Sequence, residues 1–263
     1  MNRYDELFAT SATTFVPFLV VGDPNPNQFL DLVDTVIAAG AGALELGLPF
    51  TDPVADGPVI QRAHIRAFDA GVNTDEAFDL IRKVRDRHPG VPIGLLTYAN
   101  LVDSLGPSTF YARAAESGAD SVLVADVPLR EGGRFAQVAN AHGVDPIFIA
   151  PPAATKDTLA EVAEKSAGYV YVTSRAGVTG VDQEARWEDL QRTLGILNDL
   201  KSAPPVVGFG ISKPEHVRQV FSLGAKGAIS GSAVVAIVEQ HHDDPQTLQQ
   251  QITDFVSAMS NCV

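Results

Sequence analysis

Apolar positions along the chain follow two alternating periods. Short runs rich in valine and isoleucine are separated by longer segments in which apolar residues recur every three or four positions. The segment 27–39 is typical of the longer kind, because Phe29, Leu32, Val33, Val36 and Ile37 fall on one face of a helix. Short buried strands that alternate with amphipathic helices predict a parallel sheet built from βα units.

The number of strand candidates distinguishes between two folds. Eight strands are predicted, at 15–21, 43–46, 93–97, 121–125, 146–150, 169–173, 205–209 and 227–230. Eight units in 263 residues average about 33 residues each, the size expected of a closed (β/α)8 barrel. An open doubly wound sheet is the alternative, but no GxGxxG sequence follows the first strand. We therefore predict an α/β fold, a single TIM barrel domain over 1–263, with extra short helices at the N-terminus and after strands 2 and 8.

Glycines mark several predicted turns from helix to strand. Because glycine adopts the left-handed conformation at little cost just beyond a helix, we expect positive φ angles at these positions. They are Gly40, Gly118, Gly168 and Gly224.

The charge balance excludes several partners. The chain has 32 acidic and 19 basic side chains, a formal net charge of −13 at pH 7, so its surface repels nucleic acid and anionic membranes. No run approaches the roughly 18 apolar residues of a membrane span. Cys262 is the sole cysteine, which excludes internal disulfides and favours a cytoplasmic location.

Two carboxylates lie where a barrel places its chemistry, at the carboxyl ends of the strands. Glu45 is inside an apolar strand, and Asp56 follows in a loop interrupted by Pro49, Pro53 and Pro58. A carboxyl group desolvated by apolar neighbours has a raised pKa and is suited to proton transfer. A core salt bridge for Glu45 and a helix cap at Asp56 are the structural alternatives.

Glycine-rich loops follow the last three predicted strands. They are 177–180, Gly208 to Gly210, and Gly231 with Ser232 before a short apolar helix at 234–239. Backbone N–H groups of such loops and a helix N-terminus commonly hold phosphate in this fold, although simple turns are the alternative. Three converging loops predict a phosphorylated substrate.

Lysines and histidines narrow the reaction further. The lysines are predicted in helices or turns, whereas a Schiff-base aldolase needs one at a strand end. The six histidines are predicted on helices or helix ends and do not converge as metal ligands would. The remaining chemistry is metal-free acid–base catalysis by carboxylates on a small phosphorylated molecule.

Three blocks of sequence resemble the tryptophan synthase alpha chain family. They are 15–24, 45–61 (ELGLPFTDPVADGPVIQ) and 174–180 (SRAGVTG), and the resemblance extends over nearly the whole chain. It implies a lyase that cleaves indole-3-glycerol phosphate to indole and D-glyceraldehyde 3-phosphate in L-tryptophan biosynthesis. It also implies an α2β2 heterotetramer with a beta chain that carries PLP, and no cofactor in this chain.

The resemblance assigns roles to individual residues. Glu45 resembles the acid–base group that acts on indole C3 and on the glycerol hydroxyl, and Asp56 the group that binds the indole N–H. Tyr171 resembles an active-site tyrosine, unless it merely fills the barrel core. The expected substrate contacts are Phe18, Leu96, Tyr98, Leu123, Gly180, Phe209, Gly210, Gly231 and Ser232, with Thr179 closing the loop after strand 6 over Asp56.

Three other functions fit part of the sequence. A stand-alone indole-3-glycerol phosphate lyase would have the same residues and release free indole. An isomerase of phosphoribosyl substrates would lack the pair Glu45 and Asp56 in this motif, and a non-catalytic activator of the beta chain would not need Glu45.

Overall fold

The computed structural model describes residues 2–174 and 187–263. The strands of this part are β1 Thr14–Val20, β2 Leu44–Gly47, β3 Ile93–Thr97, β4 Ser121–Val124, β5 Asp145–Ile147, β6 Ile149–Ala150, β7 Val170–Thr173, β8 Pro205–Gly208 and β9 Gly227–Ser230. The helices are α1 Arg3–Thr10, α2 Pro26–Ala38, α3 Pro58–Asp69, α4 Thr74–Arg87, α5 Ala99–Leu105, α6 Pro107–Glu116, α7 Gly133–Ala141, α8 Lys156–Lys165, α9 Trp187–Asp199, α10 Pro214–Ser222, α11 Ser232–His241 and α12 Pro245–Ser260, with a 3-10 turn, η1, at Leu129–Glu131.

The strands form a closed parallel barrel. Their order is β5-β4-β3-β2-β1-β9-β8-β7-β6, and its two ends, β5 and β6, are consecutive in the chain. The single strand predicted at 146–150 is interrupted at Phe148, where it changes partner: β5 pairs with β4, and β6 pairs with β7. The carbonyl of Phe148 still accepts a hydrogen bond from the Tyr171 N–H at 3.1 Å. The predicted barrel is therefore confirmed, and the open sheet is excluded.

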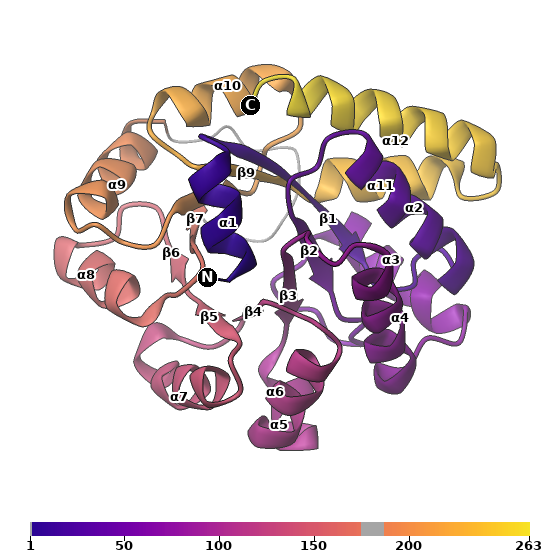
Figure 1. Ribbon diagram of the computed structural model, residues 1–263, viewed down its shortest axis with the longest axis horizontal. Helices are drawn as coiled ribbons and strands as arrows, with labels where there is room; N and C mark the ends of the chain where they lie inside the picture. Colours follow the sequence, from indigo (N-terminus) through magenta and orange to yellow (C-terminus); the bar gives the residue numbers. More distant parts are fainter. Residues whose placement is uncertain (1, 175–186) are drawn as a thin grey trace.

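Helices surround the barrel, and extra ones lie at the three places that the sequence indicates and also after β3, where two helices, α5 and α6, replace the expected one (Figure 1). α1 crosses one mouth of the barrel, two helices follow β2, and α11 and α12 follow β9 side by side. The first helix after β2, α3, has 12 residues and is longer than the predicted short insertion. No described helix combines the length and the apolar composition that a membrane span requires.

Local signals explain where the helices begin and end. Asn25 and Asn73 cap α2 and α4, because each side chain accepts a backbone N–H of the first turn. The φ angles are positive at all four predicted turn glycines, between 68° and 105°, as the left-handed conformation requires. These turns place the strand starts at one end of the barrel, so the active-site loops lie at the other.

An ion-pair network ties α1 and α4 to the strand starts. Both oxygens of Asp120, just before β4, accept hydrogen bonds at 2.7 Å: one from Arg3, and the other from Arg85 and the backbone N–H of Ile93. The Asp120 side chain is only 7% exposed, so the network replaces the water that the carboxylate loses.

We expect Asp120→Asn to lower the free energy of unfolding by about 3 kcal/mol, because it leaves Arg85 partly unpaired in a desolvated position. Chemical denaturation measures the change. The control is Asp79→Asn in the exposed pair of Arg82 and Asp79, which are 51% and 52% exposed, where the loss should stay below about 0.5 kcal/mol. Equal losses in the two variants would contradict the assignment.

Candidate active site

An apolar cavity lies at the carboxyl ends of the strands. Its empty space, about 700 Å³, includes a part that is open to solvent. Ten predicted site residues line it: Phe18, Glu45, Asp56, Leu96, Leu123, Tyr171, Phe209, Gly210, Gly231 and Ser232. The barrel therefore brings the predicted carboxylates, apolar walls and glycine loops to one site.

Glu45 enters this cavity from the centre of β2. Its side chain is 2% exposed and pairs in register with Phe18 of β1. Burial, reinforced by the nearby charge of Asp56, raises the pKa of the Glu45 carboxyl to about 8, although a hydrogen bond from Tyr169 opposes the shift. Within the described residues Glu45 forms no salt bridge, so the alternative of a core ion pair is not supported.

Tyr169, the residue just before β7, and Tyr171 within β7 both lie near Glu45, and the sequence singled out only Tyr171. The Tyr169 hydroxyl lies 3.4 Å from Glu45 Oε1 and donates to it, whereas Tyr171 lines the cavity and packs edge-on against Phe209. Burial raises the pKa of both hydroxyls, so both stay protonated. The i, i+2 spacing of the two tyrosines places both side chains on the same face of the predicted strand 169–173. This spacing is the signal in the sequence that could have identified Tyr169.

Glycines make room for two of these aromatic side chains. A Cβ at Gly208 would lie 2.1 Å from the Tyr171 hydroxyl, and one at Gly47 would lie 2.7 Å from Cζ of Phe18. Only a residue without a side chain fits such close approaches. These strand ends are therefore shaped by their neighbours in the cavity.

Asp56 is held from behind the cavity wall. The hydroxyl of Tyr98 donates to its Oδ2 at 2.6 Å, and burial together with the Asp56 charge raises the pKa of Tyr98, which keeps this donor protonated. Tyr98 is 1% exposed and does not line the cavity. The residue that precedes α3 as its N-cap is Gly57, so Asp56 is not the helix cap that the sequence left open.

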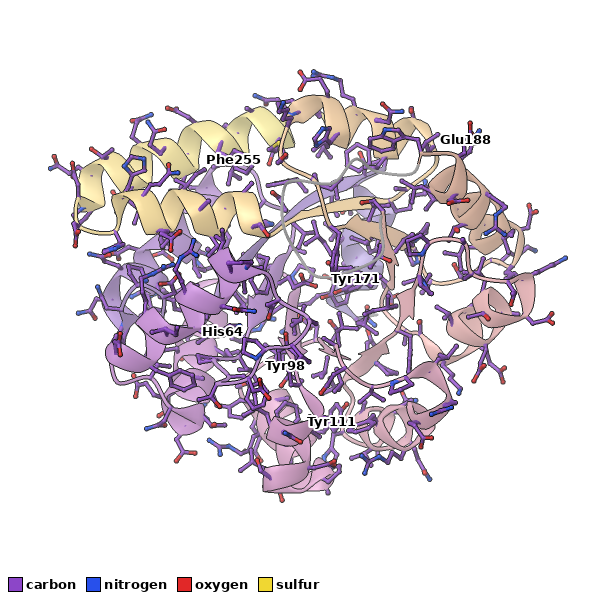
Figure 2. The ribbon with its side chains drawn as sticks, turned by 180° about the vertical axis from the view of Figure 1, so that it is seen from behind. His64, Tyr98, Tyr111, Tyr171, Glu188 and Phe255 are labelled. Carbon is purple, nitrogen blue, oxygen red and sulfur yellow. The ribbon has the colours of Figure 1, made fainter. Side chains whose placement is uncertain are left out.

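His64 is a second contact of Asp56 that the sequence interpretation missed. Its Nε2 lies 3.3 Å from Asp56 Oδ2, and both side chains are buried. His64 stands eight residues after Asp56, on the apolar stripe of α3 with Ile60, Ala63 and Ala67. A polar residue at such a core position was the available signal. Figure 2 shows His64 and Tyr98 on the same face of the barrel as Tyr171.

The loops after β8 and β9 form the polar end of the cavity. Phe209 and Gly210 both have positive φ angles, 67° and 75°, and Ser174 Oγ donates to the Phe209 carbonyl. The hydroxyl of Ser230, the last residue of β9, donates to the Ile211 carbonyl at 2.6 Å and so ties the loop after β8 to the end of β9. α11 begins at Ser232, two residues earlier than predicted, which brings its first backbone N–H groups to the cavity. An N-terminus of this kind attracts anions.

Two predicted contacts, Thr179 and Gly180, lie outside the described residues, as does most of the loop after strand 6. Within the described part of the chain, no three histidine, cysteine or acidic side chains are grouped as a metal site would require.

These features define a class of protein: a (β/α)8-barrel enzyme with a buried carboxyl of raised pKa, a second carboxyl group and the N-terminus of a helix at one cavity. The family model described as "Tryptophan synthase alpha chain" matches residues 4–263. The chain is 50% identical over 263 residues to the tryptophan synthase alpha chain of Pectobacterium atrosepticum, with 98% of each chain covered.

Solved structures agree with this match. The tryptophan synthase subunit alpha of Legionella pneumophila superposes with a TM-score of 0.88 at 28% identity, over all of this chain and 98% of the other. A chain of the tryptophan synthase a2b2 complex of Pyrococcus furiosus superposes with a TM-score of 0.82 at 32% identity, over 94% of this chain and 97% of the other. The chain belongs to the tryptophan synthase alpha chain family.

The raised pKa of Glu45 predicts a pH-dependent stability. Between its ordinary value of 4.5 and about 8, the folded chain keeps a proton that the unfolded chain releases, so stability falls as pH rises through this window. Glu45→Gln cannot ionise. We therefore expect the unfolding free energy of wild type, relative to Glu45→Gln, to fall by a few kcal/mol, in order of magnitude, from pH 5 to pH 9.

Chemical denaturation at the two pH values measures this difference. Glu116→Gln, on the exposed end of α6, is the control and should track wild type at both. A difference between Glu45→Gln and wild type that does not change with pH would show that Glu45 is not protonated in the folded chain.

Proposed function

We propose that this chain cleaves indole-3-glycerol phosphate to indole and D-glyceraldehyde 3-phosphate, as a carbon–carbon lyase of L-tryptophan biosynthesis. The observation that carries the proposal is the Glu45 carboxyl, which burial keeps protonated next to Asp56 in an apolar cavity. Retro-aldol cleavage needs a proton placed on an aromatic carbon, and such a carboxylic acid supplies it at neutral pH.

The proposed reaction balances around Glu45. Its proton goes to C3 of the indole ring, and Asp56 accepts a hydrogen bond from the ring N–H and stabilises the positive charge that this protonation creates. The bond between C3 and the glycerol chain then breaks, and its electron pair returns to the ring. The glycerol hydroxyl gives its proton back to Glu45 as the aldehyde forms, so the carboxyl ends protonated.

The remaining residues bind and orient the substrate in this proposal. Phe18, Leu96 and Leu123 form apolar walls for the indole ring, while Tyr98 acts through Asp56. Tyr171 and Phe209 enclose the reacting carbon. Gly210, Gly231 and Ser232 hold the phosphate through backbone N–H groups, because the loop after β8, tied to the end of β9, and a helix N-terminus meet there. Gly180 and Thr179 are proposed to complete the phosphate site and to close over Asp56.

We propose that the reaction needs neither a metal nor an organic cofactor in this chain. The carboxyl group supplies the proton, and the indole ring itself accepts the electron pair of the breaking bond. PLP belongs in this view to the partner beta chain.

The proposed partner is a tryptophan synthase beta chain in an α2β2 heterotetramer. A relative of the same fold forms an a2b2 complex in Pyrococcus furiosus. In this chain, large apolar side chains are exposed beside the loop 49–58: Val54 is 60% exposed, Ile65 57% and Phe68 36%. Such a patch is typical of protein–protein contacts, so we propose that this loop docks on the beta chain. One barrel domain over 1–263 and a cytoplasmic location complete the proposal.

We expect Glu45→Gln and Asp56→Asn each to reduce indole formation at least 100-fold, the typical contribution of acid–base catalysis. Indole release from indole-3-glycerol phosphate is measured with and without added beta chain, and far-ultraviolet circular dichroism verifies folding. Activity within a few-fold of wild type would remove that residue from the mechanism. Full turnover of the isolated chain, unaffected by the beta chain, would favour the stand-alone lyase.

A bulky residue at the proposed phosphate site should weaken substrate binding selectively. A Cβ at Gly231 meets only ordinary contacts of 3.7 Å with Ile60 and Phe18, so Gly231→Ala is the matched control. We expect Gly231→Leu to raise KM about 10-fold or more, since its side chain would occupy the space of the anion. Steady-state kinetics measure both variants. An unchanged KM in the leucine variant would place the phosphate elsewhere.

A further inference from the structure

His64 occupies a buried position where an apolar side chain would cost less free energy to bury. It is 2% exposed on the buried stripe of α3, whose other members are Ile60, Ala63 and Ala67. Burying an imidazole costs free energy unless a hydrogen bond compensates. The compensating partner is Asp56, whose Oδ2 lies 3.3 Å from Nε2. A side chain present only for packing would not need this contact.

The surroundings of the imidazole ring determine its tautomer. An ionised carboxylate only accepts hydrogen bonds, so Nε2 must carry the hydrogen that points to Asp56. The other nitrogen, Nδ1, is buried and has no hydrogen-bond partner among the described residues. A second N–H there would be a buried donor without an acceptor, which costs more than a bare lone pair. The neutral Nε2–H tautomer is therefore the form that fits.

In the described part of the chain, two side chains contact the Asp56 carboxylate, and both reach the same oxygen. Tyr98 donates to Oδ2 at 2.6 Å, and His64 contacts Oδ2 at 3.3 Å. Both donors are neutral, so neither cancels the charge of the carboxylate. Among the described residues both contacts fall on Oδ2, which leaves Oδ1 to accept a hydrogen bond from a ligand in the cavity that Asp56 lines.

We propose that His64 is a positioning residue: its neutral Nε2–H, together with the Tyr98 hydroxyl, fixes the Asp56 carboxylate so that Oδ1 accepts the N–H of the indole ring. The inference rests on the proposed function. It states that His64, a core residue, makes the site prefer ring ligands that carry an N–H. His64 itself does not touch the substrate and exchanges no proton with it.

A matched pair of variants separates hydrogen bonding from packing. His64→Gln places an amide N–H near the position of Nε2, whereas His64→Met has a similar length and no donor. The ligands are indole and benzothiophene, which share shape but differ in the ring N–H. Calorimetry on the full chain gives both dissociation constants for wild type, the two variants and Asp56→Asn.

We expect wild type and His64→Gln to bind indole more tightly than benzothiophene, and His64→Met to lose about 5- to 10-fold in indole affinity with benzothiophene unchanged. In kinetics, kcat/KM should fall at least as much in His64→Met and stay within about threefold of wild type in His64→Gln. Equal losses for both ligands, or unchanged preference for indole in His64→Met, would overturn the inference.

Two further measurements keep the outcomes distinct. If neither wild type nor Asp56→Asn prefers indole to benzothiophene, the proposed role of Asp56 is wrong, and so is the inference about His64. If Asp56→Asn alone loses the preference, only the role of His64 fails. The ¹⁵N NMR spectrum of the wild-type imidazole needs no variant to fold. A neutral ring with hydrogen on Nε2 is expected, and an imidazolium or an Nδ1–H tautomer would overturn the inference.

Discussion

The burial of one carboxyl group, that of Glu45, is the constraint on which the rest of the site depends. Water would stabilise its charged form, whereas in the barrel Glu45 faces a mostly apolar cavity and accepts a hydrogen bond from the Tyr169 hydroxyl. A basic neighbour would discharge the acid. Other polar groups of the cavity come from loops: Asp56 from the loop after β2, and Gly210 and Gly231 from the loops after β8 and β9. The strands supply the acid and its dry surroundings, and the loops supply charge recognition.

The two carboxylates are positioned by different means. Glu45 belongs to the hydrogen-bonded ladder of β2, whose neighbours β1 and β3 fix its height in the barrel. Asp56 lies in a loop with prolines on both sides, and its orientation depends on side chains brought from β3 and α3. The hydrogen bonds of the sheet fix the position of a strand residue, whereas a loop residue needs side-chain contacts to fix its position. This difference explains why Asp56 is contacted by Tyr98, just after β3, and by His64 of α3.

Periodicity predicted the strands well, because burial on both faces gives parallel strands a continuous apolar signature. It missed the interruption at Phe148, since the exchange of strand partners depends on barrel closure and not on local sequence. The glycine loops and Asp56 were found from their place after strands, and Glu45 was found as a carboxylate inside an apolar strand. Tyr169 and His64 were missed because their roles follow from contacts with residues that only the folded chain brings next to them. Each looks like an ordinary core residue until the fold brings it against Glu45 or Asp56.

The helix α1 has a consequence for movement through the barrel. Tyr4 of this helix is part of the buried core, Leu7 and Phe8 pack against that core, and Tyr4 is hydrogen-bonded to Ser121 at the start of β4. In the described part of the chain, α1 thus closes the barrel at the end where the strands start. Ligands must then enter and leave by the opposite mouth, beside which the loop 49–58 lies. Substrates and products then pass through the same mouth of the barrel, and a protein bound at that mouth would contact each product as it leaves.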